Sequence, residues 1–520
     1  MNAWKATTWA RPLLALLAGV IGVGGFAPVS EPLWLVLAMA VLIRLLEGVT
    51  WRQGAIVGFC FGLGHFNLGF AWLLTSLHDN GSIPWIPSYL ILFLLAAVMG
   101  IYPALFGALL PSCVRRPLFV LLAAPALWTL TEWIRTWLFT GFPWNLAGYA
   151  WSPRETILQI ADLGGVFLLS WLTVFLGAAL VVPWRRPIPW GGTFLALTLA
   201  GVTLAAAHSY GLWRLDTLNR SISAPGTTPL RIALVQGNIA QSMKWIPENQ
   251  DQTMKAYFSL TRAISPPVDL VIWPETAVPF FLQLNTAYLE RLGRLSAQVG
   301  APILTGVPTA NPEENKGERT WRFFNSVVLM TDAGSMDRRY DKHHLVPFGE
   351  FIPARWLVPK SIEKLTGGGD DFIPGPGPFP MAWEKGDLGI LICYETIFPE
   401  EVRQLAEAGA RWLINVTNDG WFGEAAKPQH LAMARMRAVE TRLPMFRVAN
   451  TGISAAFDAT GREVVRISPN QRDQVQASIP PGPMGSTLYR RTGSAWIVVF
   501  AFLLLLAWIG NRSSAATRNT

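Results

Sequence analysis

Long apolar runs alternate with short polar connections over the first 211 residues, and one more run lies near the C-terminus. Several runs approach the roughly 20 residues that a helix needs to cross a bilayer. The pattern predicts a polytopic α-helical membrane bundle of about eight transmembrane helices, seven in a domain of residues 1–211 and one in residues 494–520 with a short tail. The runs cover residues 12–28, 33–46, 55–77, 86–111, 118–139, 157–182, 190–210 and 495–509.

Lysine and arginine are concentrated in alternate connections between these runs. Such connections face the cytoplasm in most membrane proteins, so both termini are expected to be cytoplasmic. Seven spans then carry the next polar segment, residues 212–493, to the opposite side of the membrane, although Arg490 and Arg491 run against this assignment. The cations that follow the rule are Lys5, Arg11, Arg44, Arg52, Arg115, Arg116, Arg185, Arg186, Arg512 and Arg518.

The polar segment 212–493 has a different pattern. Short runs rich in β-branched residues alternate with amphipathic stretches such as residues 286–298, which is typical of a layered α/β domain. The predicted strands include residues 231–235, 269–273, 389–393 and 412–416.

Composition narrows the class of protein. Hydrophobic residues make up 51% of the chain and charged residues only 15%, which excludes an ordinary soluble protein. The net charge of +8 comes without a basic stripe interleaved with aromatic residues, so no nucleic-acid partner is expected. Cys60, Cys113 and Cys393 lie far apart, outside any Cys/His cluster, and predict neither a disulfide framework, a metal site nor a cofactor.

Three polar motifs follow apolar strands in the second domain. Trp273-Pro-Glu-Thr contains Glu275, the motif at 340–350 contains Lys342 and Glu350, and Leu391-Ile-Cys-Tyr-Glu contains Cys393. A thiol beside a base and an ammonium group can form a thioester, with the ammonium stabilising the oxyanion. Each residue also has a structural explanation: a buried thiol for Cys393, a helix cap for Glu275, and an ion pair for Lys342.

Together these motifs resemble the Glu-Lys-Cys triad of the nitrilase superfamily, in the same order. The seven leading spans, the closing eighth, Val235-Gln-Gly-Asn-Ile, Lys244-Trp245 and Asn418-Asp-Gly-Trp-Phe-Gly resemble the bacterial apolipoprotein N-acyltransferase family over nearly the whole chain. Phe351 and Gly420 depart from the family's usual tyrosine and alanine. The resemblance implies an α-β-β-α sandwich for the catalytic domain.

The resemblance also implies a ping-pong reaction at the bacterial inner membrane, with the catalytic domain on the periplasmic side. Cys393 would take an acyl chain from a phospholipid and pass it to the N-terminal amine of a diacylglyceryl-cysteine apolipoprotein. Glu275 would be the base and Lys342 the oxyanion donor. Glu350, Tyr394 and Glu395 would support the site, while Asn238, Trp245 and Trp421 would bind substrate; no metal or cofactor is implied.

Two other functions remain open. A membrane-tethered amidase would use the same triad with water as the second nucleophile, although soluble amidases need no such bundle. A transporter with a ligand-binding outer domain would need paired charges and broken helices within its spans, which these apolar runs mostly lack. Glu132, Arg135 and Asn145, in or near the fifth run, are candidates for lining a lipid entry route.

Overall fold

The structure is a computed structural model that describes residues 9–113, 117–184, 190–222, 227–315, 318–357, 364, 371–483 and 485–516. The chain forms two compact units. A helical unit contains residues 1–71, 85–215 and 487–520, and a catalytic unit contains residues 72–84 and 216–486. The three-domain division at residues 211 and 493 stays a prediction.

Where the structure describes it, the helical unit consists of helices and the loops that join them. Close packing between α3 and α4 depends on glycine, because a Cβ atom on Gly54 would lie 2.0 Å from the main-chain oxygen of Gly107. Small residues let membrane helices approach in this way. The helices are α1 Ala10–Gly22, α2 Pro32–Leu45, α3 Trp51–Gly69, α4 Trp85–Cys113, α5 Val120–Arg135, α6 Glu155–Leu158, α7 Ala161–Val181, α8 Trp190–Ile222, α14 Leu488–Thr492 and α15 Ala495–Ala516.

Three helices among the described residues are long and apolar enough to cross a membrane, namely Trp85–Ser112, Ala161–Trp184 and Trp190–Ile222. Two shorter apolar helices cover Ala10–Gly25 and Pro32–Leu45. The bundle of about eight spans therefore stays a prediction. Of the cations used for the topology, Lys5, Arg115, Arg116, Arg185, Arg186 and Arg518 lie outside the described residues.

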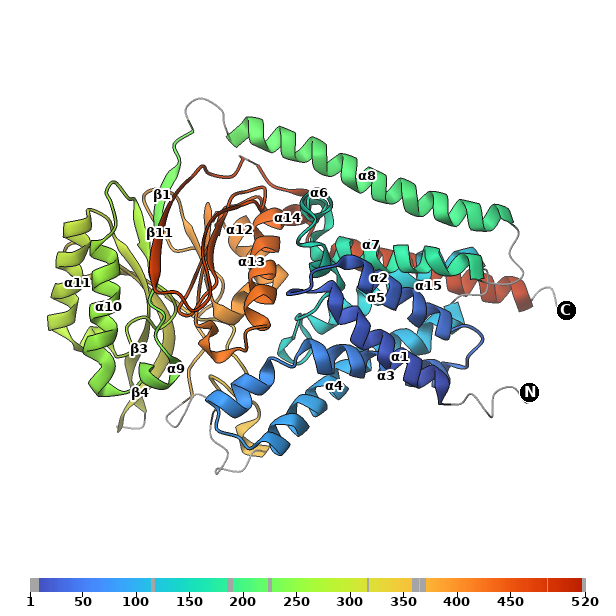
Figure 1. The fold of residues 1–520 in the computed structure, drawn as a ribbon, viewed down its shortest axis with the longest axis horizontal. Helices are drawn as coiled ribbons and strands as arrows, with labels where there is room; N and C mark the ends of the chain where they lie inside the picture. The colour runs from blue at the N-terminus through green and yellow to red at the C-terminus, as the bar shows by residue number, and fades with distance from the viewer. Residues whose placement is uncertain are drawn as a thin grey trace. The chain divides into compact units, whose positions relative to one another are not determined.

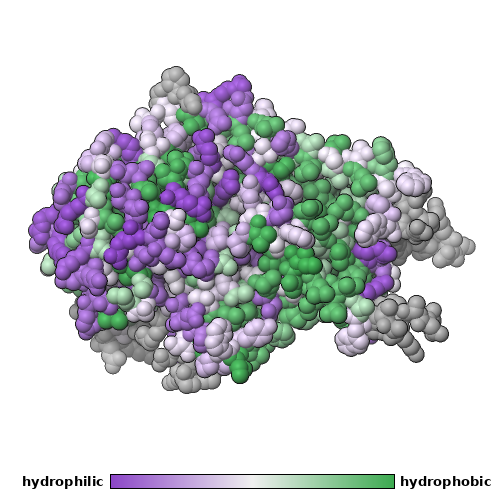
Figure 2. Space-filling model, viewed as in Figure 1, coloured by the Kyte–Doolittle hydropathy of each residue, from purple (hydrophilic) through white to green (hydrophobic). Residues whose placement is uncertain are grey.

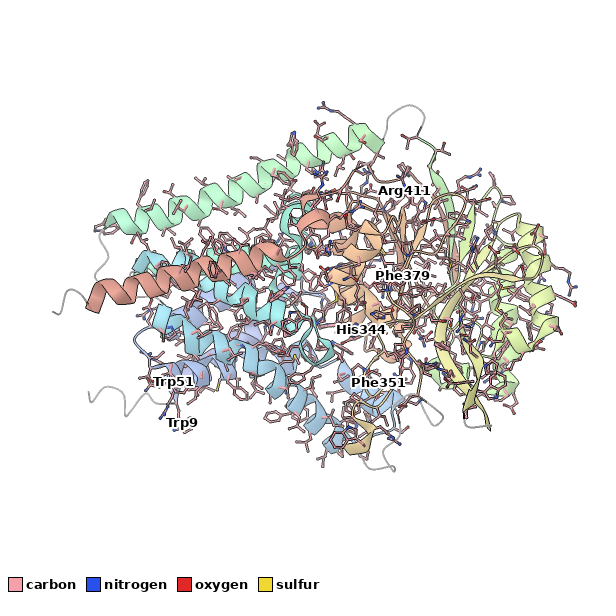
Figure 3. All side chains as sticks on the ribbon, turned by 180° about the vertical axis from the view of Figure 1, so that it is seen from behind. Trp9, Trp51, His344, Phe351, Phe379 and Arg411 are labelled. Carbon is pink, nitrogen blue, oxygen red and sulfur yellow. The ribbon has the colours of Figure 1, made fainter. Side chains whose placement is uncertain are left out.

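The surface of the helical unit is strongly hydrophobic (Figure 2). Large apolar side chains on α4 and α8 are exposed, including Ile86 and Phe194. Trp9 and Trp51, at the starts of α1 and α3, are both exposed and point away from the helices (Figure 3). An apolar surface of this extent is what a lipid environment would cover.

Glu132 and Arg135 are buried at the end of α5, where they form hydrogen bonds with main-chain groups and with the Trp128 side chain. Glu132 Oε1 accepts hydrogen bonds from the Trp128 indole at 2.9 Å and from the Ala147 amide at 2.8 Å. Arg135 Nη1 donates to the carbonyl oxygens of Phe142 and Trp144 at 2.8 and 2.7 Å. These contacts anchor the chain after α5, and a role in lipid entry stays a prediction.

The predicted span 55–77 differs from the structure at its C-terminal end. Helix α3 ends at Gly69, and a π-helical turn, Thr75–Asn80, follows. Residues 72–84 belong to the catalytic unit although the chain enters and leaves them through the helical unit. The run looked continuous because Trp72, Leu73, Leu74 and Leu77 are apolar, but Trp72 and Leu77 are buried by protein contacts.

Two mixed sheets form the centre of the catalytic unit. The first has the order β11-β1-β2-β3-β4-β5 and the second the order β10-β9-β8-β7-β6. Strands β1, β2 and β3 are parallel to one another, as are β6, β7 and β8. The strands are β1 Leu230–Gln236, β2 Leu270–Ile272, β3 Ile303–Asn315, β4 Glu318–Met330, β5 Met336–Asp341, β6 Leu388–Ile392, β7 Trp412–Thr417, β8 Met445–Ala449, β9 Ser454–Phe457, β10 Glu463–Ile467 and β11 Asp473–Ile479.

The catalytic unit has four layers, two sheets between two pairs of helices, and its hydrophobic cores join these layers. One core joins the facing sides of the two sheets, with Ile232 and Ile272 from the first and Ile392 and Ile414 from the second. Helices α10 Gln250–Arg262 and α11 Thr286–Val299 cover the outer side of the first sheet, and α12 Pro399–Glu407 and α13 Ala426–Thr441 cover the second (Figure 1). The result is the α-β-β-α sandwich expected of a nitrilase-like domain.

The predicted strands and the helix at 286–298 are confirmed to within two residues, by β1, β2, β6, β7 and α11. All four strands are buried along nearly their whole length because both faces are covered, which explains their continuous apolar runs. Glu275 follows β2, Lys342 follows β5, and Cys393 follows β6. Both sheets thus deliver polar residues from their strand ends into one site.

Candidate active site

Cys393 lies at the sharp turn between strand β6 and the short helix Cys393–Ile397. Its φ of 51° is unusual for a residue with a side chain, and such backbone strain persists only where surrounding contacts hold it. The thiol is 6% exposed. A strained, nearly buried thiol at a strand end is well placed for chemistry and poorly explained by packing alone.

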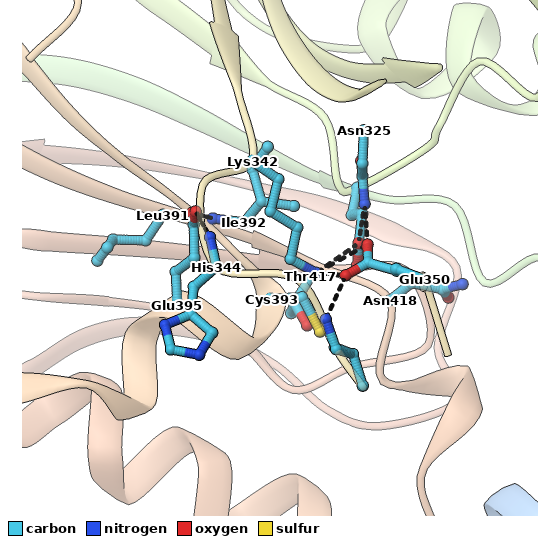
Figure 4. Close-up of polar contacts among 12 residues, drawn as sticks. Asn325, Lys342, His344, Glu350, Leu391, Ile392, Cys393, Glu395, Thr417 and Asn418 are labelled. Atoms are coloured by element: carbon cyan, nitrogen blue, oxygen red, sulfur yellow. Dashed lines mark hydrogen bonds and ion pairs between the residues drawn. The ribbon is translucent and has the colours of Figure 1, made fainter. Parts of the chain in front are cut away.

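A cluster of two carboxylates, one ammonium and one amide brings the predicted residues together (Figure 4). Lys342 Nζ lies 2.8 Å from Glu350 Oε2 and 3.8 Å from Glu275 Oε1. The side-chain amide of Asn325 donates to Glu275 Oε1 and to Glu350 Oε1, both at 2.8 Å. All four side chains are at least nine-tenths buried, so their charges interact with little screening by water.

These charges control the proton on Cys393. Burial raises the pKa of the thiol, and the negative charges of Glu275 and Asp419 raise it further, while Lys342 and a hydrogen bond with Thr417 act against them. Burial alone would lower the pKa of Lys342, but Glu350 and Glu275 outweigh burial and raise it. The resting site therefore holds a neutral thiol beside an ammonium group.

Glu395 joins the nucleophile to the segment that contains Lys342. Its Oε2 accepts from the Ile392 amide at 2.7 Å, next to Cys393. Its Oε1 accepts from the amides of His343 and His344 at 2.6 and 3.1 Å and from the Tyr340 hydroxyl at 3.1 Å. Because one carboxylate accepts hydrogen bonds from both segments, it fixes the separation between Lys342 and Cys393.

A second buried network contacts the main chain at Cys393. The Asn415 amide donates to the carbonyl oxygens of Leu391 and Cys393 at 3.1 and 3.4 Å. Arg447 donates to both Asn415 and Asp419, and Asp419 also accepts from Thr417 at 2.8 Å. Burial alone would raise the pKa of Asp419, but Arg447 and then His430 outweigh it, so the pKa is lowered and the carboxylate stays charged.

Lys244 is a second buried lysine in the site. It ends the short helix α9 Gln241–Lys244, is 1% exposed, and its Nζ donates to the main-chain oxygen of Glu275 at 3.0 Å. Burial lowers the pKa of Lys244 to about 8, although the charges of Glu275 and Cys393 raise it in part. The pKa of Lys244 is thus lowered and that of Lys342 raised, although both lie beside Glu275.

The remaining predicted residues lie in different surroundings. Tyr394 is buried and packs edge-on against Phe398, with ring centroids 5.0 Å apart. Trp245 follows Lys244 and is 45% exposed. Trp421 offers its carbonyl oxygen to Ser76 at 2.7 Å. Asn238 donates to the carbonyl oxygen of Asn470 at 2.8 Å, a contact that holds a turn and does not reach the triad.

Sequence reasoning missed Asn325 and gave Lys244 no role. A signal exists for Asn325, since it is an amide within the apolar run Phe323-Phe-Asn-Ser-Val-Val of β4. Lys244 was noted only as part of the Lys244-Trp245 motif, and nothing local indicates that its side chain turns inward. Among the described residues, no group of three or more His, Cys, Asp or Glu side chains could hold a metal ion.

Two protein families match separate parts of this chain. The carbon-nitrogen hydrolase family matches residues 231–489, and the apolipoprotein N-acyltransferase N-terminal domain family matches residues 18–179. Among solved structures, Nit3 of Saccharomyces cerevisiae, a member of branch 10 of the nitrilase superfamily, has a TM-score of 0.37 and 20% identity, covering 49% of this chain and 91% of Nit3.

Similar proteins named apolipoprotein N-acyltransferase cover almost the entire chain. The protein from Geobacter metallireducens is 35% identical over 96% of both chains, and that from Methylococcus capsulatus is 36% identical over 92% of both. The protein from Azotobacter vinelandii is 35% identical over 96% of this chain and 95% of its own. With both domains matched and nearly full coverage, this chain belongs to the apolipoprotein N-acyltransferase family.

Proposed function

We propose that this protein is an apolipoprotein N-acyltransferase that works through a Cys393 thioester. The observation that carries the proposal is the buried cluster of Glu275, Lys342 and Cys393 in a chain of this family. The donor would be a phospholipid and the acceptor the N-terminal amine of a diacylglyceryl-cysteine apolipoprotein. The distances at Lys342 and the burial of all three residues support these roles.

The first half-reaction would load the acyl chain. Glu275 takes the proton of the Cys393 thiol as sulfur attacks the ester carbonyl of the phospholipid. Lys342 and the main-chain N–H after Cys393 hold the oxyanion. When the carbon–oxygen bond breaks, Glu275 returns the proton to the leaving alkoxide, so a lysophospholipid departs and the thioester remains.

Three further residues would position the triad without touching the substrate, namely Glu350, Asn325 and Glu395. Glu350 and Asn325 hold Lys342 and Glu275 by the hydrogen bonds described above, so the oxyanion donor and the base keep their orientation. Glu395 fixes the Cys393 turn against the Lys342 segment. We assign substrate contacts to Asn238, Trp245 and Trp421, as the resemblance to the family implies, and the 45% exposure of Trp245 beside Lys244 supports its part in this assignment.

The same proposal includes a bacterial inner-membrane location. About eight transmembrane helices, cytoplasmic termini and a periplasmic catalytic domain would bring the thiol to the membrane face where lipoproteins mature. Support comes from the apolar helices and from the exposed hydrophobic side chains of the helical unit.

Intact-mass measurement tests the proposal. The purified full-length protein is incubated with a dipalmitoyl phospholipid in mixed micelles, with or without a synthetic diacylglyceryl-cysteine lipopeptide. We expect a palmitoyl adduct on the wild type and none on Cys393→Ala, and we expect the lipopeptide to discharge the adduct as an amide. An adduct that water removes as fast as the lipopeptide would instead identify an amidase-like hydrolase.

A further inference from the structure

An amide and a guanidinium group lie buried side by side in the second sheet, among strands that are otherwise mostly apolar. Asn415 lies on β7, and Arg447 lies beside it on β8, in register with it. Both residues are 0% exposed. Burial of groups this polar costs free energy unless their hydrogen bonds are formed, and an apolar pair would fill the same space without that cost. We therefore looked for what the two side chains hold.

Arg447 determines which way the Asn415 amide points. One guanidinium nitrogen donates to Asn415 Oδ1 and the other donates to Asp419 Oδ2. Because arginine has donors and no acceptor, it must face the oxygen of the amide, which leaves the NH₂ group for other acceptors. The ion pair with Asp419 holds Arg447 in turn. The orientation of the Asn415 side chain is thus fixed by its neighbours.

The NH₂ group of Asn415 contacts the main chain that leads into the nucleophile. It donates to the carbonyl oxygens of Leu391 and Cys393 at 3.1 and 3.4 Å. The peptide group between Leu391 and Ile392 is held at both ends, because the Ile392 amide donates to Glu395 Oε2 at 2.7 Å (Figure 4). Asn415 therefore contacts two successive carbonyl oxygens on the same side of this segment.

The second of these carbonyl oxygens belongs to the peptide group that joins Cys393 to Tyr394. The N–H of the same group is the one to which the proposed function assigns part of the oxyanion. A trans peptide group is planar, and its C=O and N–H bonds point in opposite directions. Whatever holds the carbonyl oxygen of Cys393 therefore sets the direction of the Tyr394 N–H. The φ of 51° at Cys393 means that surrounding contacts must hold this turn.

We propose that Asn415, held by Arg447, is a positioning residue for the oxyanion of the tetrahedral intermediate. By holding the carbonyl oxygen of Cys393, it directs the N–H of Tyr394 toward the place where the substrate's carbonyl oxygen gains negative charge. It acts through this peptide group and not on the substrate itself. The inference rests on the proposed function, because the oxyanion forms only when the sulfur attacks a carbonyl carbon.

Two reactions of the same sulfur separate this role from a structural one. Acylation by a phospholipid passes through the oxyanion. Alkylation by iodoacetamide does not, because the sulfur forms its bond to a saturated carbon as iodide leaves. Both reactions need the Cys393 thiolate and access to it. The ratio of the acylation rate to the alkylation rate therefore reports on the oxyanion, whereas a general disturbance of the site changes both rates.

Two substitutions remove the donor in different ways. Asn415→Asp keeps the size of the side chain and an oxygen for Arg447, but a carboxylate has no N–H to donate. Asn415→Leu removes the donor without adding a charge. Gln236 on β1 supplies the matched controls, because its buried amide donates to the carbonyl oxygens of Ser468 and Gln471, both at 2.8 Å. Gln236→Glu and Gln236→Leu make the same changes at an amide whose acceptors lie outside the Cys393 turn.

The experiment uses the full-length protein in mixed micelles, with Cys60 and Cys113 replaced by alanine so that iodoacetamide reacts at Cys393. Intact mass gives the rate of palmitoylation by a dipalmitoyl phospholipid and the rate of alkylation. For both Asn415 variants we expect the ratio of these rates to fall about tenfold or more. Loss of an oxyanion donor costs about a hundred- to a thousandfold, and Lys342 remains in place. The Gln236 variants should keep the wild-type ratio.

Arg447→Lys tests the same contact from behind, should the Asn415 variants fail to fold. It keeps a positive charge beside Asp419 but loses the fork that reaches both Asp419 and Asn415, so the ratio should again fall. A wild-type ratio in the folded Asn415 variants or in Arg447→Lys would overturn the inference, and so would an equal fall in the Gln236 controls. If the wild type is alkylated but never acylated, the proposed function itself is rejected.

Discussion

The environment of the Cys393 sulfur sets when it becomes reactive. Burial raises the thiol pKa, so the protein does not keep a free thiolate that oxidation or water would consume. In the proposed reaction, the thiolate would form only as Glu275 takes the proton, in the presence of an ester carbonyl.

This state predicts the pH dependence of alkylation by iodoacetamide. In the wild type the rate at Cys393 should still rise above pH 9, since an ordinary cysteine titrates at about 8.5 and the pKa of Cys393 is higher. Glu275→Gln removes a negative charge and should move the profile to lower pH, while Lys342→Met should move it higher. Lys244 and Asp419 also face the thiol and stay unchanged in both variants.

Peptide mass spectrometry measures this profile at Cys393 itself, with Cys393→Ala as the blank. A shift to higher pH in Glu275→Gln would contradict the assigned arrangement, because a carboxylate near the sulfur can only disfavour the thiolate.

Substitution of Asn325 tests the buried cluster around Lys342 at the scale of a single residue. Its amide is the described donor shared by Glu275 and Glu350, and hydrogen bonds to charged groups contribute about 1.5–3 kcal/mol. Asn325→Ala should slow formation of the acyl-enzyme roughly ten- to a hundredfold. Asn311→Ala, at an exposed amide on the adjacent strand β3, should leave the rate unchanged. Equal rates for both variants would remove Asn325 from the site.

At the scale of elements, the turn between α3 and α4 is part of the catalytic unit. Ser76 donates to the Trp421 carbonyl oxygen at 2.7 Å, and the Asn80 amide donates to the carbonyl oxygens of Gly420 and Trp421 at 3.1 and 3.2 Å. Trp72 packs edge-on against Phe422, with ring centroids 5.0 Å apart. The turn therefore holds the loop that contains Asp419.

Loss of these contacts should lower the reactivity of Cys393. Each neutral hydrogen bond contributes about 0.5–1.5 kcal/mol, so the double variant Ser76→Ala/Asn80→Ala should loosen the loop and slow acyl-enzyme formation several-fold. Asp79→Asn, at an exposed neighbour on the same turn, is the control. Stopped reactions analysed by intact mass measure the rate; a double variant as fast as the control would show that the loop is held without the turn.

The strands and the three polar motifs could be predicted from the sequence because their signals are local. Continuous apolar runs mark β6 and β7, and Cys393 follows β6 directly. The turn at 72–84 could not be predicted, because Trp72 and Leu77 are apolar whether lipid or protein covers them. Asn325 stands out as an amide within an apolar strand, but neither its role nor that of Lys244 could be assigned, since their partners lie far along the chain and only the fold brings them together.

At the scale of the whole molecule, the two units have different surfaces. Apolar side chains are widely exposed on the helical unit, whereas the catalytic unit encloses its own cores between sheets and helices. Figure 2 shows both kinds of surface on one chain. Two parts with different surfaces can be expected from the sequence, because hydropathy averaged over long runs does not depend on which distant residues meet.

The side of the membrane on which the catalytic unit lies is a property of the whole molecule. It can be tested because the unit lies either in the cytoplasm or on the opposite side. If the N-terminus is cytoplasmic, as proposed, an odd number of spans before residue 216 would put the catalytic unit on the opposite side of the membrane, and an even number would put it in the cytoplasm. A folded polar domain cannot change sides, since each charge at the bilayer centre costs about 2.5 kcal/mol or more. Labelling of single cysteines therefore reports a fixed topology.

In a variant whose three cysteines are replaced by alanine, Ser265→Cys marks an exposed position of the catalytic unit and Arg52→Cys marks a predicted cytoplasmic connection. We expect a membrane-impermeant maleimide to label residue 265 in intact spheroplasts and residue 52 only after lysis. The reverse pattern would reject the periplasmic site. It would also leave the thioester chemistry untouched, because the contacts that carry it lie within the catalytic unit and do not depend on which side of the membrane that unit occupies.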